Sequence, residues 1–146
     1  MLRWITAWWN RRRTGATKQA RTGAEGERLA RTFLQVKCGY TIVACNWRSP
    51  RDRRDEIDVV CRDGPVLVFV EVKTRAAEAL VPGFYAVDRA KRKVMLRVCK
   101  DYLRRLSPRD RPETFRFDVV EVAGLGADPV VRHFENVALF PKNLRW

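Results

Sequence analysis

The segment Val66–Lys73 constrains the fold most, because its residues are apolar on both faces of an extended chain until Glu71. Such a pattern indicates a strand covered on both sides, near the middle of a sheet. A second strand is expected over Glu56–Cys61, and the intervening Asp63-Gly64-Pro65 is a turn signal. We therefore expect a buried hairpin at the centre of the fold.

The remaining elements follow from the spacing of apolar residues. A helix is expected from Ala24, with its apolar stripe ending before Gly39, and a longer helix over Val87–Leu106. Further strands are expected over Tyr40–Trp47, Phe115–Val122 and His133–Phe140. The order αβββαβ in 146 residues predicts one α/β domain with a central mixed sheet flanked by helices.

Residues 1–22 are basic, rich in tryptophan and without acidic residues. We expect them to form a flexible N-terminal arm, and residues 23–146 to form the domain. Two readings of the arm stay open. Residues 1–13 could bind nucleic acid or a membrane surface as a short amphipathic helix, or their tryptophans could pack on the domain as a variable extension. No apolar run reaches the ~18 residues of a membrane-spanning helix.

The charge of the chain points to a polyanionic partner. Lys and Arg number 30 against 17 Asp and Glu, a net charge of +13. Such an excess favours nucleic acid as the partner, ahead of an anionic membrane surface. The four cysteines form no C-x-x-C pair, so a zinc site is not expected and a reduced, cytoplasmic protein is the simpler reading.

Two carboxylates and a lysine are placed where charges are costly. Glu71 and Lys73 project from one side of the buried strand, and the hairpin register brings Asp58 near Glu71. Two carboxylates repel each other, and a hard divalent cation such as Mg²⁺ would relieve that repulsion. The alternative is a structural ion cluster in which Lys73 neutralises both carboxylates without a metal.

Several other residues have two readings. Glu27 and Glu25 flank opposite sides of the first helix's apolar stripe, so either could face the site or simply favour the helix N-terminus. Trp47 packs the hairpin or stacks on a base. Asp118 is interpreted as a structural partner of a nearby arginine, and His133 as a surface or edge-strand residue.

The spaced motifs resemble a known family. Gly26-Glu27, Asn46-Trp47-Arg48, Glu56-Ile57-Asp58, Phe69-Val70-Glu71-Val72-Lys73-Thr74-Arg75, Lys91 and Arg116-Phe117-Asp118 are similar to the bacterial UPF0102 (YraN-like) family over about residues 23–122. The resemblance implies a PD-(D/E)XK, restriction-endonuclease-like fold, similar to archaeal Holliday-junction resolvases, which act as dimers on branched DNA. It also implies that Asp58 and Glu71 bind metal, that Lys73 is the motif lysine and that Glu27 is the helix glutamate. Asp55 departs from the pattern, which usually has glycine before Glu-Ile-Asp.

These observations lead to an expected function. We expect a metal-dependent endonuclease that hydrolyses DNA rather than RNA, as a homodimer on branched substrates, with a non-catalytic nucleic-acid-binding protein as the alternative. Mg²⁺ or Mn²⁺ would be held by Asp58, Glu71 and the Val72 carbonyl, while Lys73 and Glu27 act on water or phosphate. Nucleic acid would be bound by basic residues around the site, namely Arg48, Arg51, Arg53, Arg54, Arg75, Lys91 and Lys93.

Overall fold

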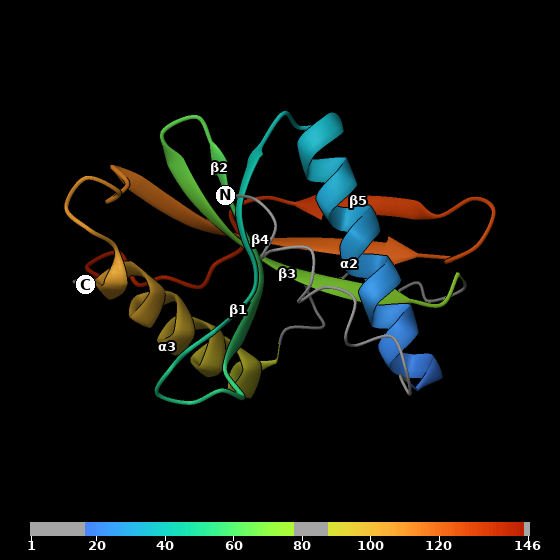
Figure 1. The fold of residues 1–146 in the computed structure, drawn as a ribbon, viewed down its shortest axis with the longest axis horizontal. Helices are drawn as coiled ribbons and strands as arrows, with labels where there is room; N and C mark the ends of the chain where they lie inside the picture. Colours follow the sequence, from blue (N-terminus) through green and yellow to red (C-terminus); the bar gives the residue numbers. More distant parts are fainter. Residues whose placement is uncertain (1–16, 78–87, 145–146) are drawn as a thin grey trace, which may run out of the picture.

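The computed structural model describes residues 17–77 and 88–144, and residues 1–16 of the expected arm and most of the expected 75–85 loop lie outside these ranges. Two helices and five strands are present in the described ranges (Figure 1). They are α2 (Lys18–Val36), β1 (Thr41–Arg48), β2 (Glu56–Asp63), β3 (Val66–Arg75), α3 (Arg89–Arg105), β4 (Thr114–Ala123) and β5 (Val130–Phe134). This order confirms the expected α/β fold with an αβββαβ core.

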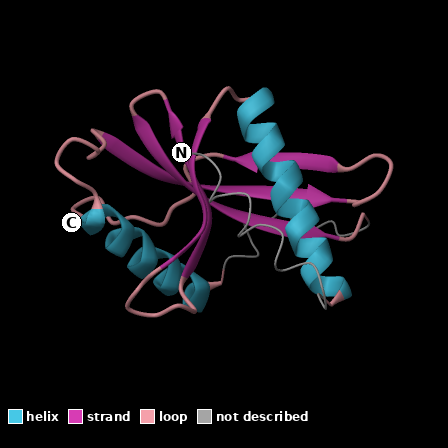
Figure 2. Cartoon of the chain, in the orientation of Figure 1, coloured by secondary structure: helices cyan, strands magenta, loops and turns pink. Residues whose placement is uncertain are grey.

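The strands form one sheet in the order β1-β2-β3-β4-β5. β3 and β4 are parallel, and every other neighbouring pair is antiparallel. The sheet is therefore mixed, and β3 is its middle strand, as the doubly apolar pattern of residues 66–73 predicts. Figure 2 shows the strands as a continuous twisted sheet with the two helices on either side.

Each face of the sheet has its own apolar core because side chains alternate along the strands. Leu67 and Phe69 of β3 pack with Met95 and Tyr102 of α3. Val68 and Val70 face the other way and pack with residues of α2, which crosses β3, β4 and β5 in Figure 1. The hairpin is thus buried between the helices, and Glu71 and Lys73 fall on the α3 side by alternation.

Helix α2 begins earlier than its apolar pattern indicates. Thr17 is the N-cap, and its hydroxyl accepts a hydrogen bond from the Ala20 amide at 3.2 Å. The first turn after it is exposed, so no apolar stripe marks it in the sequence. The boundary expected between residues 22 and 23 consequently falls inside α2.

The fifth strand also lies earlier than expected. β5 covers Val130–Phe134, whereas the expected strand runs over residues 133–140. Asn136 ends the extended stretch because its φ of 52° is left-handed, and its amide donates to Asp118 Oδ1 at 2.9 Å. Within residues 17–77 and 88–144, no helix combines the length and apolar character needed to cross a membrane.

Candidate metal centre

Asp58 lies where β2 and β3 stop pairing. The ladder between these strands runs from Asp63–Val66 to Val59–Val70, and one more step would set Asp58 opposite Glu71. The Asp58 carboxylate instead accepts a hydrogen bond from the Val72 amide, at 2.8 Å from Oδ2. β3 continues beyond this point only through its pairing with β4. The two strands therefore form a fork, with a carboxylate on each of them.

Glu71 is buried, and its two carboxylate oxygens have different surroundings. Oε1 lies 2.9 Å from Lys73 Nζ and 3.2 Å from Lys91 Nζ. Oε2 is buried and has no hydrogen-bond partner among the described residues. Because buried polar atoms are usually satisfied, this oxygen is available to accept a ligand such as a cation or a water.

The expected ion cluster differs in detail from this arrangement. Lys73 contacts Glu71, and the hydrogen bond that Asp58 accepts comes from the backbone. Lys91, expected on a nucleic-acid-binding surface, instead reaches into the carboxylate site from the first turn of α3. The two lysines approach the same oxygen, so the other Glu71 oxygen and the Asp58 carboxylate have no ion pair with any residue in ranges 17–77 and 88–144.

Glu27 is brought to the sheet by a close contact between α2 and β3. Gly26 is buried, and a Cβ at that position would collide with Thr74 Oγ1. The absence of a side chain therefore lets the helix approach β3 at this turn. The Glu27 carboxylate accepts a hydrogen bond from Asn46 Nδ2 at 3.0 Å and lies 3.9 Å from an Arg31 nitrogen.

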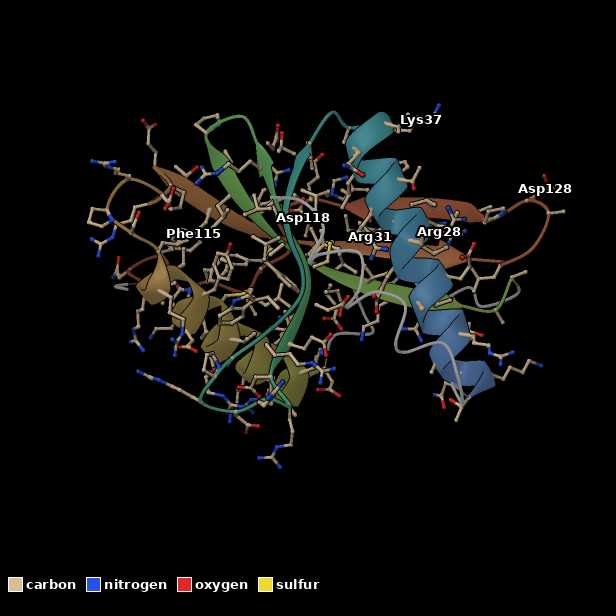
Figure 3. The ribbon with its side chains drawn as sticks, in the orientation of Figure 1. Arg28, Arg31, Lys37, Phe115, Asp118 and Asp128 are labelled. Atoms are coloured by element: carbon tan, nitrogen blue, oxygen red, sulfur yellow. The ribbon has the colours of Figure 1, made fainter. Side chains whose placement is uncertain are left out.

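Glu25 and Glu27 have different environments, which the helical spacing alone does not distinguish. Glu25 is exposed and forms a two-point ion pair with Arg28, at 2.7 and 2.9 Å. Figure 3 shows Arg28 and Arg31 along α2. Glu27 is the half-buried residue of the two and the one whose charge is felt by Asp58.

The electrostatics of the fork favour a bound cation. Burial and the nearby Glu71 carboxylate raise the pKa of Asp58 to about 8, and the Glu27 carboxylate adds a smaller increase. The hydrogen bond from the Val72 amide and the charge of Lys91 lower this pKa, but their effects are smaller than those of burial and Glu71. Asp58 therefore keeps a proton near neutral pH when no counter-charge is present. A divalent cation would displace that proton, because metal ligands bind in their deprotonated form.

The donor set suits a hard cation. Among the described residues, no three His, Cys, Asp or Glu side chains are grouped to hold a metal ion. A site at the fork would rest on two carboxylates, a backbone carbonyl such as that of Val72, and water. Mg²⁺ and Mn²⁺ accept such an oxygen-only set, since Mg²⁺ keeps several waters and binds through one or two carboxylates.

The basic residues expected to bind nucleic acid are only partly free. Arg48 lies 2.8 Å from Glu56, Arg54 2.9 Å from Asp52, and Arg51 3.6 Å from Asp101. Arg53 and Lys93 are exposed, whereas Arg75 has a buried Nε without a hydrogen-bond partner among the described residues. Three of the four arginines between residues 48 and 54 therefore form an ion pair with an acidic side chain.

A hollow of about 380 Å³ opens beside Glu27. It lies between the N-terminal half of α2 and the adjoining ends of β1 and β2, and small helix residues form one wall. Its lining consists of Ala20, Gly23, Ala24, Glu27, Asn46, Arg48 and Glu56. Of the residues discussed for the metal centre, the hollow includes Glu27 and its partner Asn46, and neither Asp58 nor Glu71 lines it.

Comparison with known proteins places the chain in a family. The model of the uncharacterised protein family UPF0102 matches residues 26–122. The chain belongs to UPF0102. A UPF0102 protein of Symbiobacterium thermophilum is 45% identical over 102 residues, which are 70% of this chain and 81% of the relative. A UPF0102 protein of Chlorobaculum tepidum is 43% identical over 106 residues (73% and 78%), and one of Koribacter versatilis is 43% identical over 102 residues (70% and 68%).

The UPF0102 match includes both prongs of the fork and the contacts around it. Gly26, Glu27, Asp58, Glu71 and Lys73 all lie within residues 26–122. β5 lies beyond the matched range. The carboxylate site therefore lies entirely within the region that the UPF0102 family model matches.

Asp55 stands where the resemblance leads us to expect glycine, and its side chain forms a salt bridge with Arg97. Its buried carboxylate accepts hydrogen bonds from Arg97 Nε and Nη2, at 2.6 and 2.7 Å. The pair joins the loop before β2 to α3. Asp55 is therefore a structural link between these elements, and its oxygens are not free to bind a cation.

Two features of the site escaped the sequence interpretation. Asn46 contacts Glu27 from β1, and no spacing rule links these positions. Glu121 is fully buried on β4, in register with Lys73 on one side and Arg132 on the other, and Arg132 Nη1 lies 3.0 Å from its Oε1. A signal for Glu121 was present, because it continues the alternation of Phe117 and Val119 toward the α3 side.

Asp118 belongs to a separate polar network, labelled near the centre of Figure 3. The expected arginine partner is Arg116, 3.0 Å from Oδ1, and His133 Nε2 lies 2.9 Å from Oδ2. His133 is on the edge strand, as expected, but its side chain is only 8% exposed, so the surface reading is wrong. Trp47 is half-buried, with its ring centroid 5.1 Å from that of Tyr102, which agrees with the packing interpretation.

Proposed function

We propose that this protein is a divalent-metal-dependent nuclease of the PD-(D/E)XK type that hydrolyses phosphodiester bonds in DNA. The observation that carries the proposal is that Glu71 Oε2, buried at the fork next to Asp58 and beside a lysine, has no hydrogen bond with any described residue. Two carboxylates beside an ammonium group suit metal-assisted phosphoryl transfer, because the carboxylates can hold the metal and the ammonium can stabilise negative charge on the phosphate.

Each residue has a definite role in this proposal. Asp58, Glu71 and the Val72 carbonyl would hold Mg²⁺ or Mn²⁺, which when bound would lower the pKa of a water and neutralise charge on the phosphate. Lys73 donates from its ammonium to a phosphate oxygen or to the attacking water, where negative charge increases in the transition state. Glu27 accepts a hydrogen bond from a water at the edge of the site.

The charge of the chain supports nucleic acid as the substrate. A net charge of +13 favours a polyanion, and exposed cations such as Arg53 and Lys93 can contact phosphates. Most such contacts read the backbone, so we propose recognition of DNA structure, including branched DNA, over base sequence. A homodimer and a cytoplasmic location belong to the same proposal.

Purified protein tests the activity directly. Single-stranded, duplex, flap and four-way DNA would be incubated with Mg²⁺, with Mn²⁺ and with chelator. We expect cleavage only with metal, and a loss of at least about a hundredfold in Glu71→Gln and in Lys73→Ala. Arg28→Gln, which alters an exposed ion pair on α2, is the matched control. Cleavage that survives both site substitutions would assign the activity to a contaminant or to another site.

The two lysines on Glu71 Oε1 favour a second candidate, a nucleic-acid-binding protein without turnover. In that case the ammonium groups would neutralise Glu71 in place of a metal. Titration calorimetry with Mn²⁺ separates the candidates. A metal site abolished by Asp58→Asn supports the nuclease, while DNA binding without any Mn²⁺ binding supports the second candidate.

A further inference from the structure

Asn46 has an unusual backbone conformation in the middle of β1. Its φ is 49°, in the left-handed region, although strand residues on both sides of it pair regularly with β2. The pairs Cys45–Val59 and Trp47–Ile57 bracket it, so Asn46 stands opposite Asp58 across the sheet. Asparagine tolerates this conformation better than other residues with a Cβ.

The left-handed residue changes the direction of the side chains that follow it. Ala44 and Trp47 both pack against the α3-side core although they are three positions apart, a spacing that regular alternation places on opposite faces. The left-handed backbone of Asn46 interrupts the alternation of side chains between the two faces of β1. Its own side chain is thereby freed from the core and lines the hollow beside α2.

The amide of Asn46 is directed to Glu27. Nδ2 donates to Glu27 Oε2 at 3.0 Å, which links edge strand β1 to helix α2. The Arg31 nitrogen lies farther from the same oxygen, at 3.9 Å. Asn46 therefore makes the shortest polar contact that Glu27 has among the described residues.

A neutral donor has a different effect on a carboxylate from a cation. Lys73 and Lys91 both orient Glu71 and offset its charge. The Asn46 amide orients Glu27 without adding a positive charge, and the Arg31 guanidinium offsets the charge of Glu27 only from the longer distance of 3.9 Å. That charge is felt at Asp58, so it remains available to attract a cation or one of the waters around it.

We infer that Asn46 is a positioning residue, which holds Glu27 toward Asp58 so that the glutamate can act on the metal or its water. The inference rests on the proposed function, which it deepens by adding a residue behind Glu27. Asn46 itself touches neither the metal nor the phosphate in this scheme.

Two substitutions separate the amide from the backbone conformation. Asn46→Gly removes the amide but accepts a positive φ without strain, whereas Asn46→Ala removes the amide and strains the backbone. We expect both variants to bind Mn²⁺ and to cleave DNA about 10-fold to 100-fold less well than the parent protein. Both variants lose the hydrogen bond to Glu27, and Asn46→Ala should lower the melting temperature further because its backbone is strained.

A double-mutant cycle tests whether Asn46 acts through Glu27. Mn²⁺ affinity by calorimetry and cleavage rate would be measured for Asn46→Gly, Glu27→Gln and the combination. If Asn46 works by holding Glu27, the second substitution adds no further loss to Glu27→Gln. Losses that multiply, or an Asn46→Gly variant that behaves like the parent protein, would overturn the inference.

The same measurements distinguish this inference from the proposed function. A parent protein that binds Mn²⁺ and cleaves DNA, with no effect of Asn46→Gly, contradicts the role of Asn46 alone. A parent protein that neither binds Mn²⁺ nor cleaves any substrate contradicts both.

Discussion

The Asp58 carboxylate accepts a hydrogen bond from the Val72 amide, at the position where a backbone carbonyl of β2 would continue the ladder with β3. A side chain thus replaces the backbone as the partner of β3 at this point. Because the Asp58 carboxylate accepts this hydrogen bond in place of a backbone carbonyl, β2 and β3 can separate here while the Val72 amide keeps a hydrogen-bond partner. The space between them is where the two carboxylates can share a cation.

The raised pKa of Asp58 predicts how stability depends on pH when metal is absent. Above pH 3.8 the unfolded chain has lost the Asp58 proton, while the folded protein keeps it up to about pH 8. The folded state therefore binds more protons in this window, and its stability falls as pH rises through it. In chelator, thermal unfolding from pH 5 to 8 should show a steeper decline for the parent protein than for Asp58→Asn. Equal slopes, or no reduction of the parent slope by Mn²⁺, would contradict this account.

The contact between Gly26 and Thr74 predicts that a second substitution, Thr74→Ala, restores the stability lost in Gly26→Ala. Gly26→Ala puts a methyl group into Thr74 Oγ1 and should destabilise the protein by about 1–3 kcal/mol through overpacking. It should also slow cleavage, because the turn that carries Glu27 must move away from β3. Adding Thr74→Ala removes the colliding oxygen and should restore most of the stability in urea unfolding. A single variant as stable as the parent would show that the helix is not held this closely.

The Asp55–Arg97 pair should affect stability and leave the chemistry unchanged. Arg97→Ala leaves a buried carboxylate without its partner, which costs about 1–3 kcal/mol. Combining it with Asp55→Gly removes the stranded charge and should recover part of the loss, as measured by denaturant midpoints. Mn²⁺ affinity should be unchanged in both variants. A changed affinity would instead make Asp55 part of the metal site.

Asp118 predicts the opposite pH dependence from Asp58. Burial works against ionisation, but hydrogen bonds from His133, Arg116 and the Asn136 amide hold the pKa of Asp118 below the ordinary value of an aspartate, 3.8. Its contribution is complete above that value and is lost as pH falls through the lower folded pKa. Asp118→Asn should therefore cost about 3 kcal/mol at pH 7 and progressively less in strong acid. Unfolding curves at pH 7 and pH 2 would test this, and Mn²⁺ binding should not change.

The sequence predicts much of the fork because its main determinants are local. The doubly apolar pattern of β3 and the turn at Gly64 set the hairpin register, which puts Asp58 next to Glu71. Side-chain alternation then assigns Glu71 and Lys73 to one face. Contacts between elements far apart in the chain are not expressed in such patterns. Lys91 reaches Glu71 from another helix, and its position depends on how α3 packs.

The choice between Glu25 and Glu27 shows the same limit in another form. Helical spacing puts both residues at the margin of the apolar stripe, and only the packing of Gly26 on Thr74 decides which of them approaches the sheet. The conformation of Asn46 is a second example. An asparagine tolerates a positive φ, but the residue pattern of β1 does not show that Asn46 adopts one, and Trp47 beyond it contacts Tyr102 of α3.

Helix α2 is attached to the sheet at two separate places. Gly26 packs against Thr74 near the middle of the helix, and just beyond its end the Tyr40 hydroxyl accepts a hydrogen bond from Arg116 Nη2 at 2.7 Å. Sliding of the helix along the sheet would have to break both attachments together. Glu27 is consequently in place before any ion arrives, so binding requires little rearrangement of the main chain. Amide hydrogens in the middle of α2 should then exchange slowly, and at the same rate with and without metal.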